Sequence, residues 1–502
     1  MKYIIGLFLI FSSFHSYTQP RRDAVWCFGD SAQIDFNQQP PTVSWCSNRS
    51  RGTACSIADS SGNLLFYCHT FYIPLWQTGY DKLGVVWNKN NEIMENGDSL
   101  VGRGWYHEMV IIPNVLNYNQ YYLFHSGVSL NGQLYYSIID LSYNNGLGKV
   151  VQKNTLLDSL NGEQVSDGLT AIKHGNGRDW WVIFRSYGNN ANNAFHKYLI
   201  TTYGIQHFPD QNIGTQTYAG FIRLKFSNNG SKLLLHNTGG LMELYNFDRC
   251  SGDLSNLRLI HPEINSIQDY FWGAEFSPND SLLYISTEET PTYLYQFNLY
   301  VSNIYSSKII LDTFSFPLYG GSDLKLAIDG KIYRGYPYIT GGPFYFPYPD
   351  SVFNNYNMNL SVIENPNILG TGCNYQSLSF NLGGKRTYNG LPNNPYYDMP
   401  ALGGSVCDTL GLPNGVQQLV KNTIAVFPNP AGDKIYFTAD EFVNAHAENI
   451  LIKVYDFTGK VVMEIRPKGN ELDVSDLNQG IYTFSFFVNG NYNSSAKITV
   501  LK

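Results

Sequence analysis

Charge is scarce in this sequence. Asp, Glu, Lys and Arg make up 15% of the 502 residues, against about 25% in an average globular protein. The net charge is −7, and neutralising phosphates requires clustered Lys and Arg, so nucleic acid is excluded as a partner. Beyond the first residues, no apolar run reaches the length of about 18 residues that a membrane-spanning helix needs. We therefore expect a soluble mature chain.

Signatures of catalysis are missing as well. His107 and Glu108 begin a zinc-protease motif, but Ile111 stands where its second histidine belongs. The chain contains no Gly-x-Ser-x-Gly elbow and no phosphate-binding glycine loop. It has no CxxC, and no Cys/His cluster has zinc-finger spacing. We therefore predict no catalytic, metal-binding or cofactor-binding residue.

Cysteines are few and odd in number, which leaves at least one of them unpaired. Two interpretations stay open for the four that lie between residues 27 and 68: a disulfide among them, or buried thiols in a large fold. The sequence does not settle the pairing. The seven cysteines are Cys27, Cys46, Cys55, Cys68, Cys250, Cys373 and Cys407.

Aromatic residues, by contrast, are abundant. They make up 15% of the chain, with 38 Tyr and 30 Phe, and hydrophobic residues make up 43%. Such a chain folds, and it favours strands because aromatic side chains suit pleated surfaces. A length of 502 residues allows two or three domains. We predict an all-β protein.

One pattern recurs along most of the chain: a short apolar strand, a turn containing Gly, Asn or Asp, and a second apolar strand. One turn residue from each copy gives positions 62, 119, 177, 230, 280, 330 and 384, at spacings of 50 to 58 residues. Regular spacing at the length of one blade predicts a β-propeller over residues 19–395. Seven blades is the first choice, and six and eight are the alternatives.

The last copy, residues 378–388, lacks outer strands. We hypothesise that residues 24–28 and 32–36 supply them, so that the two ends of the repeat region close the ring. Residues 396–422 are rich in Gly, Pro and Asn without steady periodicity, which predicts a linker.

The N-terminus predicts a secretory signal peptide over residues 1–18. Lys2 supplies the positive charge, residues 3–11 are apolar, and Ser16 and Thr18 place small side chains before a cleavage site at Gln19. About nine apolar residues cannot cross the roughly 30 Å of hydrocarbon in a bilayer, so a membrane anchor is not expected.

Residues 423–502 form a second predicted unit, of a size that folds alone. Its alternating apolar strands predict a small antiparallel Ig-like β-sandwich. The expected strands are residues 434–437, 450–455, 460–465, 481–487 and 496–501.

Four short motifs follow one another in this unit, and with them it resembles the type A C-terminal sorting domain of the type IX secretion system of Bacteroidetes. Phe427 departs from the family pattern, in which Tyr is common, and the change is conservative. The residues that carry the resemblance are Phe427, Pro428, Asn429, Pro430, Tyr455, Asp456, Gly459, Lys460, Leu477, Gly480, Tyr482 and Lys497.

The resemblance implies a route of delivery. It implies export to the periplasm, contact with the type IX secretion machinery, and release or display at the outer cell surface. In the family the sorting domain is usually removed, and the protein then attaches to surface lipopolysaccharide or is released. The N-terminal region also resembles uncharacterised propeller proteins of the same bacteria, which implies a fold but no activity. The segments concerned are residues 26–29, 34–36, 62–67, 86–88 and 390–393.

An aromatic insertion interrupts the sixth repeat. The preferred interpretation is a loop that packs on itself, and the alternative is an aromatic recognition loop for sugars or other flat ligands. Its residues are Tyr336, Tyr338, Phe344, Tyr345 and Tyr348.

For the function, we expect a non-enzymatic binding or adhesion scaffold with an extracellular glycan or protein as its ligand. The alternative is an extracellular propeller enzyme that acts on glycans as a hydrolase or lyase. Acidic groups converging from different blades at the mouth of the ring would favour the enzyme, and a mouth lined by Asn, Ser and Tyr would favour binding. A structural component of the cell surface is a third interpretation.

Overall fold

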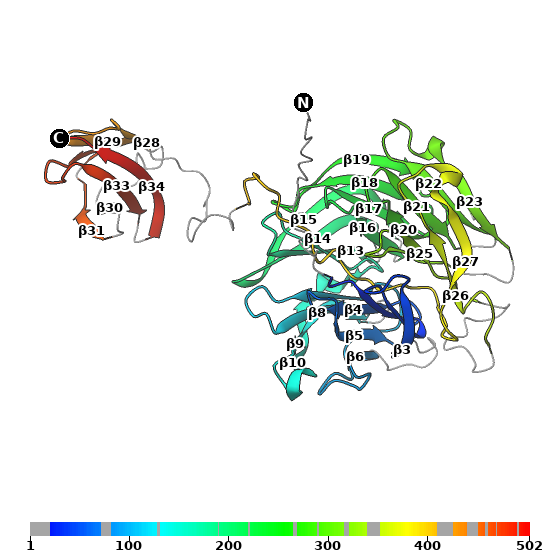
Figure 1. Ribbon diagram of the computed structural model, residues 1–502. Coiled ribbons are helices and arrows are strands. Elements are labelled where there is room, and N and C mark those ends of the chain that lie inside the picture. Colours follow the sequence, from blue (N-terminus) through cyan, green and yellow to red (C-terminus); the bar gives the residue numbers. More distant parts are fainter. Residues whose placement is uncertain are drawn as a thin grey trace, which may run out of the picture. The chain divides into compact units, whose positions relative to one another are not determined.

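The computed structural model of the chain divides into two compact units, residues 1–410 and 411–502 (Figure 1). Among the described residues no helix has the length and apolar character to cross a membrane. The predicted signal peptide, residues 1–18, lies outside the described residues. The structure describes residues 21–71, 82–127, 131–188, 190–218, 221–264, 269–288, 291–315, 321–338, 352–408, 425–438, 450–456, 460–467, 469–488 and 491–502.

The first unit consists of small antiparallel sheets that follow one another along the chain. Its described part holds seven of them, with three to five strands each. The first three sheets are β1 (Val25–Phe28), β2 (Asp30–Asp35), β3 (Thr42–Arg49); β4 (Ala54–Ala58), β5 (Leu64–Thr70), β6 (Gly84–Asn88); and β7 (Met109–Pro113), β8 (Gln120–Gly127), β9 (Asn131–Asp140), β10 (Lys149–Asp158). The fourth is β11 (Gln164–Val165), β12 (Thr170–Lys173), β13 (Trp180–Tyr187), β14 (Asn192–Thr201), β15 (Gly204–Thr217).

The remaining three sheets of this unit have four strands each, paired in chain order. They are β16 (Ile222–Phe226), β17 (Lys232–Asn237), β18 (Met242–Phe247), β19 (Leu254–His261); β20 (Phe271–Phe276), β21 (Leu282–Thr287), β22 (Thr292–Asn298), β23 (Ile309–Phe314); and β24 (Leu324–Leu326), β25 (Ile332–Arg334), β26 (Asn359–Ile363), β27 (Tyr375–Asn381). Short 3-10 turns are η1 (Asn144–Gly146), η2 (Leu160–Gly162), η4 (Tyr305–Ser307) and η5 (Gly370–Cys373).

The sheets stack around a common axis as the blades of a propeller. The strands β4, β7, β12, β16, β20 and β24 come from successive sheets, and each contacts the next in chain order. In β21, the second strand of its sheet, every residue is buried, so both faces of this strand are covered. Radial stacking explains this burial, because each sheet covers the faces of its neighbours. The prediction of an all-β propeller with seven blades is confirmed for the described residues.

The ring closes where the two ends of the repeat region meet. Trp26 and Phe36 pack edge-to-face on Tyr333 of β25, with ring centroids 5.8 and 5.3 Å apart. Asp30 and Arg386 form an antiparallel bridge, and the Arg386 Nε donates to the Asp30 carboxylate over 2.8 Å. A buried charged pair held by backbone and side-chain hydrogen bonds fixes the ends against each other.

The blade at the junction of the two ends is built from other strands than we expected. We expected residues 24–36 to complete a blade that began at residue 378. Instead β1 and β2 form a sheet with β3, and residues 378–380 belong to β27, the outermost strand of the preceding sheet. The reason is the pairing of β27 with β26, after which Gly383 and Gly384 take positive φ and turn the chain toward Asp30.

The chain does not leave the ring after its last strand. Residues 386–408, which we call the tail, pack against the propeller, and Leu391, Tyr397 and Met399 are buried. A Cβ at residue 390 would lie 2.0 Å from the carbonyl oxygen of Gly52, so only glycine lets the tail pass here. The first unit therefore extends to residue 410, past residue 396, where we expected the linker to begin.

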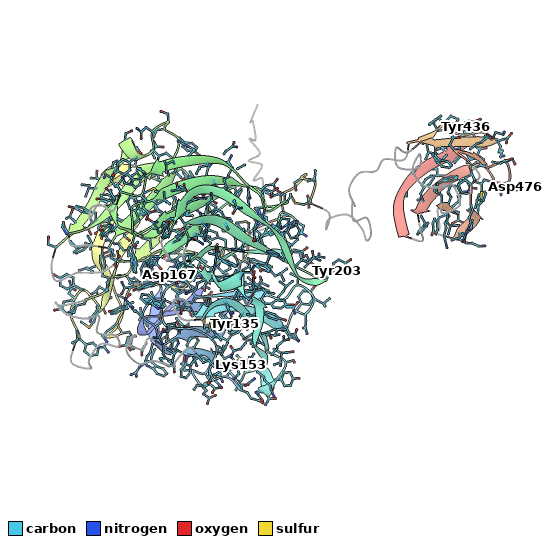
Figure 2. All side chains as sticks on the ribbon, turned by 180° about the vertical axis from the view of Figure 1, so that it is seen from behind. Tyr135, Lys153, Asp167, Tyr203, Tyr436 and Asp476 are labelled. Atoms are coloured by element: carbon cyan, nitrogen blue, oxygen red, sulfur yellow. A yellow bond between two sulfur atoms is a disulfide. The ribbon has the colours of Figure 1, made fainter. Side chains whose placement is uncertain are left out.

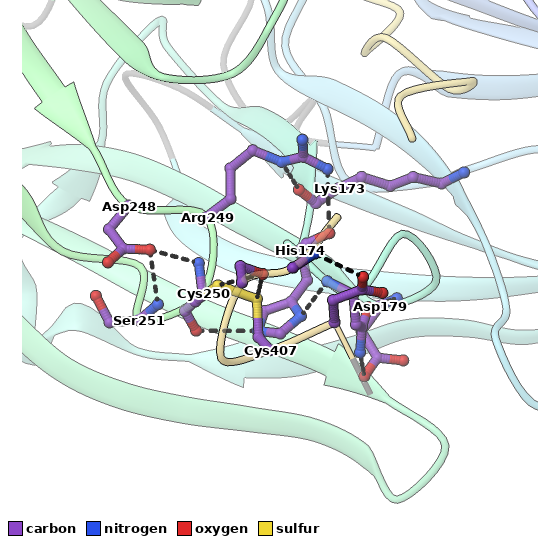
Figure 3. Close-up of a disulfide and its surroundings, with 12 residues drawn as sticks. Lys173, His174, Asp179, Asp248, Arg249, Cys250, Ser251 and Cys407 are labelled. Atoms are coloured by element: carbon purple, nitrogen blue, oxygen red, sulfur yellow. Dashed lines mark hydrogen bonds between the residues drawn. A yellow bond between two sulfur atoms is a disulfide. The ribbon is translucent and has the colours of Figure 1, made fainter. Parts of the chain in front are cut away.

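A disulfide joins the tail to the ring. Cys407 is bonded to Cys250, which follows β18, and their Cα atoms lie 5.5 Å apart (Figure 3). Nearby, the Arg249 guanidinium donates to the carbonyl oxygens of Lys173 and Pro400, at 2.9 and 2.7 Å. The four cysteines between residues 27 and 68 are buried thiols, one of the two interpretations that the sequence left open.

The second unit is a β-sandwich. One sheet has the order β28 (Ala425–Phe427), β29 (Lys434–Thr438), β32 (Glu471–Asp473), and the other β31 (Val461–Ile465), β30 (Ile450–Tyr455), β33 (Gly480–Val488), β34 (Asn491–Val500). Their inner faces share one apolar core, in which the rings of Phe437 and Phe486 lie 5.5 Å apart. The burial of β30 alternates strictly, as expected for a sheet with one dry face.

Candidate functional site

The axis of the propeller is the first place to look for a site, because the first strands of all blades converge there. In this protein the tail occupies it. The Asn393 Nδ2 donates to the carbonyl oxygens of Met109 and Leu169, both at 2.9 Å, and the Tyr397 hydroxyl donates to Ile111 over 3.1 Å. The tail thus satisfies backbone groups at the inner edges of several blades.

Three carboxylates from different sheets converge on the same region. Asp23 precedes β1, Glu275 lies on β20 and Asp323 precedes β24. The Lys325 Nζ lies 3.0 Å from Asp23, and the Lys225 Nζ lies 2.6 Å from Glu275. Each acid therefore has a cationic partner or hydrogen-bond donors within the protein, and none of them is an unpaired general acid or base.

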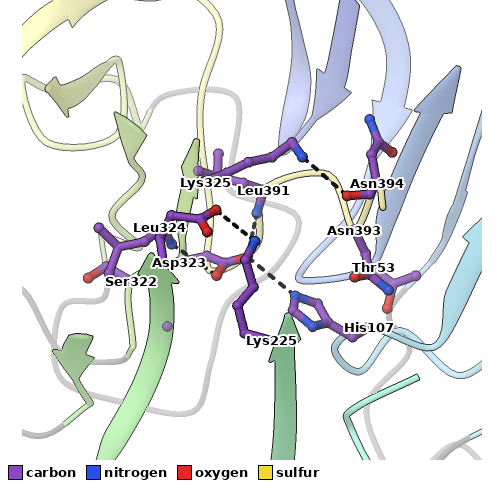
Figure 4. Close-up of polar contacts among 12 residues, drawn as sticks. Thr53, His107, Lys225, Ser322, Asp323, Leu324, Lys325, Leu391, Asn393 and Asn394 are labelled. Carbon is purple, nitrogen blue, oxygen red and sulfur yellow. Dashed lines mark hydrogen bonds and ion pairs between the residues drawn. The ribbon is translucent and has the colours of Figure 1, made fainter. Parts of the chain in front are cut away.

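Asp323 is held by backbone and side-chain donors (Figure 4). It accepts hydrogen bonds from the backbone N–H of Leu324 and Leu391, at 2.9 and 3.1 Å, and from the His107 Nε2 at 3.4 Å. Burial raises its pKa, but the hydrogen bond from His107 and the charge of Arg223 outweigh this and lower the pKa of Asp323 to about 2. The carboxylate is therefore ionised at every physiological pH.

Little space remains between these groups. The cavity at the axis has a volume of about 40 Å³, and its walls include His107, Asp323 and the tail residues 392–396. A water molecule needs about 15 Å³ of such volume. The cavity therefore holds water but no sugar ring or peptide.

Other buried charges lie along the axis. Figure 2 shows Asp167 inside the ring, whereas Lys153 and Tyr203 lie at its periphery. Burial raises the pKa of Asp167, and the positive charge of Arg223 opposes this shift. The Arg223 guanidinium in turn lies over the Trp272 ring, 4.2 Å from its centroid.

A larger hollow opens beside the exit of the tail. We call it the mouth depression. Its volume is about 760 Å³, and it is bounded by the tail and by the turns β16–β17, β20–β21 and β24–β25. Its lining residues are Arg21, Asp23, Asn37, Gln39, Asn228, Pro278, Leu326, Ala327, Ile328, Tyr396, Tyr397, Asp398, Met399 and Pro400.

The lining of the mouth depression combines amides and aromatic rings with paired charges. Asn37, Asn228 and Gln39 supply the amides, and Asp398 is paired with the Arg22 guanidinium over 3.2 Å. Ile328 keeps 40% of its surface exposed at the rim. Such a mixture suits a ligand with both polar edges and apolar faces, as glycans and peptides have.

The incomplete zinc-protease motif has two separate structural roles. His107 takes part in the axial pair with Asp323, and the Glu108 carboxylate is buried. It accepts hydrogen bonds from the Thr70 hydroxyl and from the backbone N–H of Arg103 and Gly104, at 2.9 to 3.1 Å. Burial outweighs these bonds and raises the pKa of Glu108 to about 7.

Glu108 should make the stability of the propeller fall as pH rises. The folded state keeps its proton up to about pH 7, whereas the unfolded chain releases it near the ordinary value of 4.5. Between these two pH values the folded state binds more protons than the unfolded chain. As the pH rises, the free energy of unfolding of wild type should therefore fall by on the order of 3 kcal/mol relative to that of Glu108→Gln. Urea unfolding of both proteins from pH 4.5 to 8 measures this difference. Glu95→Gln, at an exposed position, is the control, and parallel curves for wild type and Glu108→Gln would contradict the expectation.

The aromatic insertion, for which a recognition loop was the alternative interpretation, is only partly described. Tyr336 is buried, and the Arg334 guanidinium lies over its ring at 4.5 Å, so it is not available to a ligand in this structure. Tyr338 is partly buried and stacks on Tyr356 with centroids 6.0 Å apart. Phe344, Tyr345 and Tyr348 lie outside the described residues.

The motif residues of the C-terminal unit hold its strands together. The side-chain amide of Asn429 bonds to Lys497 and Thr499 of β34, both at 2.9 Å, which ties the first strand to the last. Asp456 closes the turn before β31 by accepting a hydrogen bond from the Lys460 N–H at 3.0 Å. The Tyr482 hydroxyl donates to Asn478 over 2.9 Å.

The other motif residues lie close to these contacts. Phe427 is 48% exposed and stacks on Tyr436, and Pro428 and Pro430 flank Asn429. Tyr455 and Gly480 lie at the end of β30 and the start of β33, and Leu477 is buried in the core. Gly459 lies outside the described residues.

Comparison with protein families decides what this unit is. Residues 425–501 match the family described as a secretion system C-terminal sorting domain. The unit is a type IX secretion sorting domain. The chain is therefore a secreted β-propeller protein that the type IX route carries to the cell surface or the medium. The sorting domain implies interaction with the type IX secretion machinery.

Solved structures similar to the chain are distant. A putative 6-phosphogluconolactonase from Bacteroides fragilis is 10% identical, with 74% of this chain and 98% of that chain covered and a TM-score of 0.44. One from Bacteroides uniformis is 11% identical, with 62% and 89% covered and a TM-score of 0.42. PorZ, a surface component of the type IX secretion system of Porphyromonas gingivalis, is 9% identical, with 94% and 63% covered and a TM-score of 0.36. Similarities this weak transfer no function. A search of curated proteins finds no match.

Sequence inspection missed one group of side chains with the spacing of metal ligands. Asp158, His196 and His207 each offer a ligand atom, and these atoms lie within 4.8 Å of one another. The residues are separated by 38 and 11 positions in the chain and come from three strands. No motif spacing reveals such a group, because only the pairing of the strands brings it together.

Proposed function

We propose that this secreted protein is a non-enzymatic binding scaffold and that its ligand, a glycan or an extended peptide, binds in the mouth depression. One observation carries the proposal: the tail fills the axis of the ring and leaves about 40 Å³ there, whereas the depression beside it offers about 760 Å³. A rigid propeller with a preformed, amide-rich hollow loses little entropy on binding.

The arrangement of charges supports binding over catalysis. Three carboxylates converge at the axis, as an enzyme would require, but Asp23 and Glu275 are paired with lysines and Asp323 with His107. Two of the three are also covered by the tail, since Asn394 donates to Asp23 and Tyr396 to Glu275, at 2.6 and 2.8 Å. A glycosidase needs one carboxyl group to donate a proton and the other to face the sugar, and neither task is open to these groups.

The experiment that tests this proposal is a glycan and peptide array probed with residues 19–410, followed by titration calorimetry on the hits. Ile328→Arg places a charged side chain at the rim of the depression and should weaken binding at least about tenfold, roughly 1.4 kcal/mol. Ile93→Arg is the matched control, because Ile93 is likewise exposed on the propeller. Equal affinities for the two variants would place the ligand elsewhere. Glycan cleavage during the incubation, detected by mass spectrometry, would favour the enzyme instead.

A further inference from the structure

A cleft of about 630 Å³ lies on the fourth blade and its neighbour, away from the axis. Its lining includes Asp158 at the end of β10, His196 on β14, and His207 and Asp210 on β15. Asp158, His196 and His207 present ligand atoms within 4.8 Å of one another. Imidazole and carboxylate side chains in such a group are the ligands of divalent transition metals.

A bulge in the sheet brings Asp210 into this group. Phe195 is paired with Gln211 and Lys197 with Phe208, so the single residue His196 faces the two residues Pro209 and Asp210. Bulges of this kind re-aim side chains and are common beside functional sites. As a result the Asp210 Oδ1 lies 3.1 Å from the His196 Nδ1 and 3.0 Å from the His207 Nε2.

Hydrogen bonds on the side of the ring away from Asp210 fix the orientation of His196. Its Nε2 lies 3.0 Å from the Ser186 hydroxyl oxygen, and the Ser186 hydroxyl donates to the Glu163 carboxylate over 2.5 Å. Because that hydroxyl proton is directed to Glu163, Ser186 accepts the Nε2–H of His196. The imidazole is then the tautomer with a lone pair on Nδ1, the arrangement that supports a metal-binding histidine.

This lone pair has no partner in the protein. His196 is 8% exposed, and its Nδ1 is buried and makes no hydrogen bond, although Asp210 lies only 3.1 Å away. The buried Nδ1 lone pair and the carboxylate at the wall of the cleft are both acceptors, and they repel unless a cation lies between them. In the described part of the chain no Lys or Arg forms an ion pair with Asp158, Glu163 or Asp210, and the only basic side chains paired with Asp210 are His196 and His207. Asp158 accepts hydrogen bonds from the Tyr198 hydroxyl and from the backbone N–H of Leu160.

We propose that Asp158, His196, His207 and Asp210 bind a divalent transition metal, with zinc as the best match. Zinc bonds of about 2.0 to 2.2 Å in a tetrahedron place ligand atoms roughly 3.3 to 3.5 Å apart. The two separations from Asp210, 3.1 and 3.0 Å, are a few tenths of an ångström shorter than this spacing. The ligand atoms of Asp158, His196 and His207 lie within 4.8 Å of one another and would have to move closer by about an ångström. His207 is half exposed, so the metal faces the cleft and can accept a water molecule or an anionic group of a ligand.

The same contacts also resemble a Ser-His-Asp triad, with Ser186, His196 and Asp210 in order. Ser186, however, is 1% exposed and does not line the cleft, and its proton is directed to Glu163. A nucleophile must reach its substrate. The arrangement therefore supports metal binding rather than acyl transfer.

The test uses the full-length secreted protein without an affinity tag, stripped of metal by a chelator and titrated with Zn²⁺ in a calorimeter. Wild type should bind one zinc per chain. His207→Ala and Asp210→Asn should each weaken zinc binding more than about 100-fold. Loss of a residue that only hydrogen-bonds to a metal ligand already lowers metal affinity by about 10- to 100-fold, and loss of a ligand should lower it further. Glu163→Gln changes only the hydrogen bonds that orient His196 through Ser186, and it should lower zinc affinity about tenfold. Asp98→Asn, at an exposed carboxylate elsewhere on the propeller, should change nothing.

Two further measurements make the result decisive. Cobalt substitution should give a visible absorption band in wild type that is lost in His207→Ala, and zinc should raise the melting temperature of wild type only. Because His207 is half exposed and Asp210 is on the surface of the cleft, these variants should fold, and circular dichroism verifies that they do. Zinc binding unchanged in both variants would overturn the proposal, as would less than about one zinc per ten chains of wild type at micromolar zinc. Covalent labelling of Ser186 by a fluorophosphonate would overturn it in favour of acyl transfer.

Discussion

Deleting residues 423–502 is expected to trap the protein in the periplasm, with essentially none at the cell surface or in the medium. The sorting domain is the only part of the described chain that matches a secretion signal of the outer membrane. It has its own core, so its removal leaves the propeller intact. Cell fractionation and protease accessibility in a host with a type IX system measure the outcome. Surface display of the truncated protein would contradict the assignment.

A point variant separates the sorting signal from mere chain length. Phe484 is fully buried in the core of the sorting domain, so Phe484→Asp should unfold this domain and reproduce the deletion. Val461→Ala is the control, because Val461 is 42% exposed on the same domain and its change should leave export unaffected. Normal export of Phe484→Asp would show that a folded sorting domain is not required.

The second large effect is expected from the tail. Tyr397→Ala should destabilise the propeller by about 3 to 5 kcal/mol, as other buried aromatic-to-alanine changes do. Tyr397 is 2% exposed, belongs to the largest apolar cluster of the ring, and packs on Trp180 with centroids 6.1 Å apart. Urea unfolding of residues 19–410 measures the loss. Tyr118→Ala is the control, because Tyr118 is 92% exposed.

Truncation provides the stronger form of this test. A chain that ends at residue 385 lacks Arg386, which bridges to Asp30, and all the tail contacts at the axis. Buried backbone carbonyls such as those of Met109 and Leu169 would lose their donors, at about 1 to 3 kcal/mol each. We expect this chain to lack a cooperative unfolding transition, whereas a chain that ends at residue 410 keeps one. Equal stability of the chains that end at residues 385 and 410 would show that the tail does not stabilise the propeller.

Local features of the sequence account for much of the fold. The turns at Gly230 and Gly330 both have positive φ, which glycine adopts at no steric cost, and they mark hairpins at the predicted positions. The alternation in residues 450–455 is retained as strict burial in β30. The sorting-domain motifs could be recognised in the sequence for the same reason, because their contacts are local. Asp456 and Lys460, for example, are hydrogen-bonded within a single turn.

Contacts between segments that are far apart in the chain could not be predicted from the sequence. Nothing in residues 378–388 distinguishes the first strand of a new blade from the last strand of the previous one, because both are short and apolar. Cys250 and Cys407 are 157 residues apart, and an odd set of seven cysteines allows many pairings. The tail resembled a linker because its composition is that of a loop, whereas its burial depends on the ring that surrounds it.

Local sequence patterns are enough to predict a chain of small repeated sheets followed by an exported sandwich. Strand alternation, turn residues and sorting motifs act over a few positions, so they can be read from neighbouring residues. Three features follow from the folded arrangement alone: the tail closes the axis, His107 contacts Asp323 across 216 residues, and His196 faces Asp210 beside Asp158. Such groups form when strands far apart in the chain pack together, and no local pattern records which strands will meet.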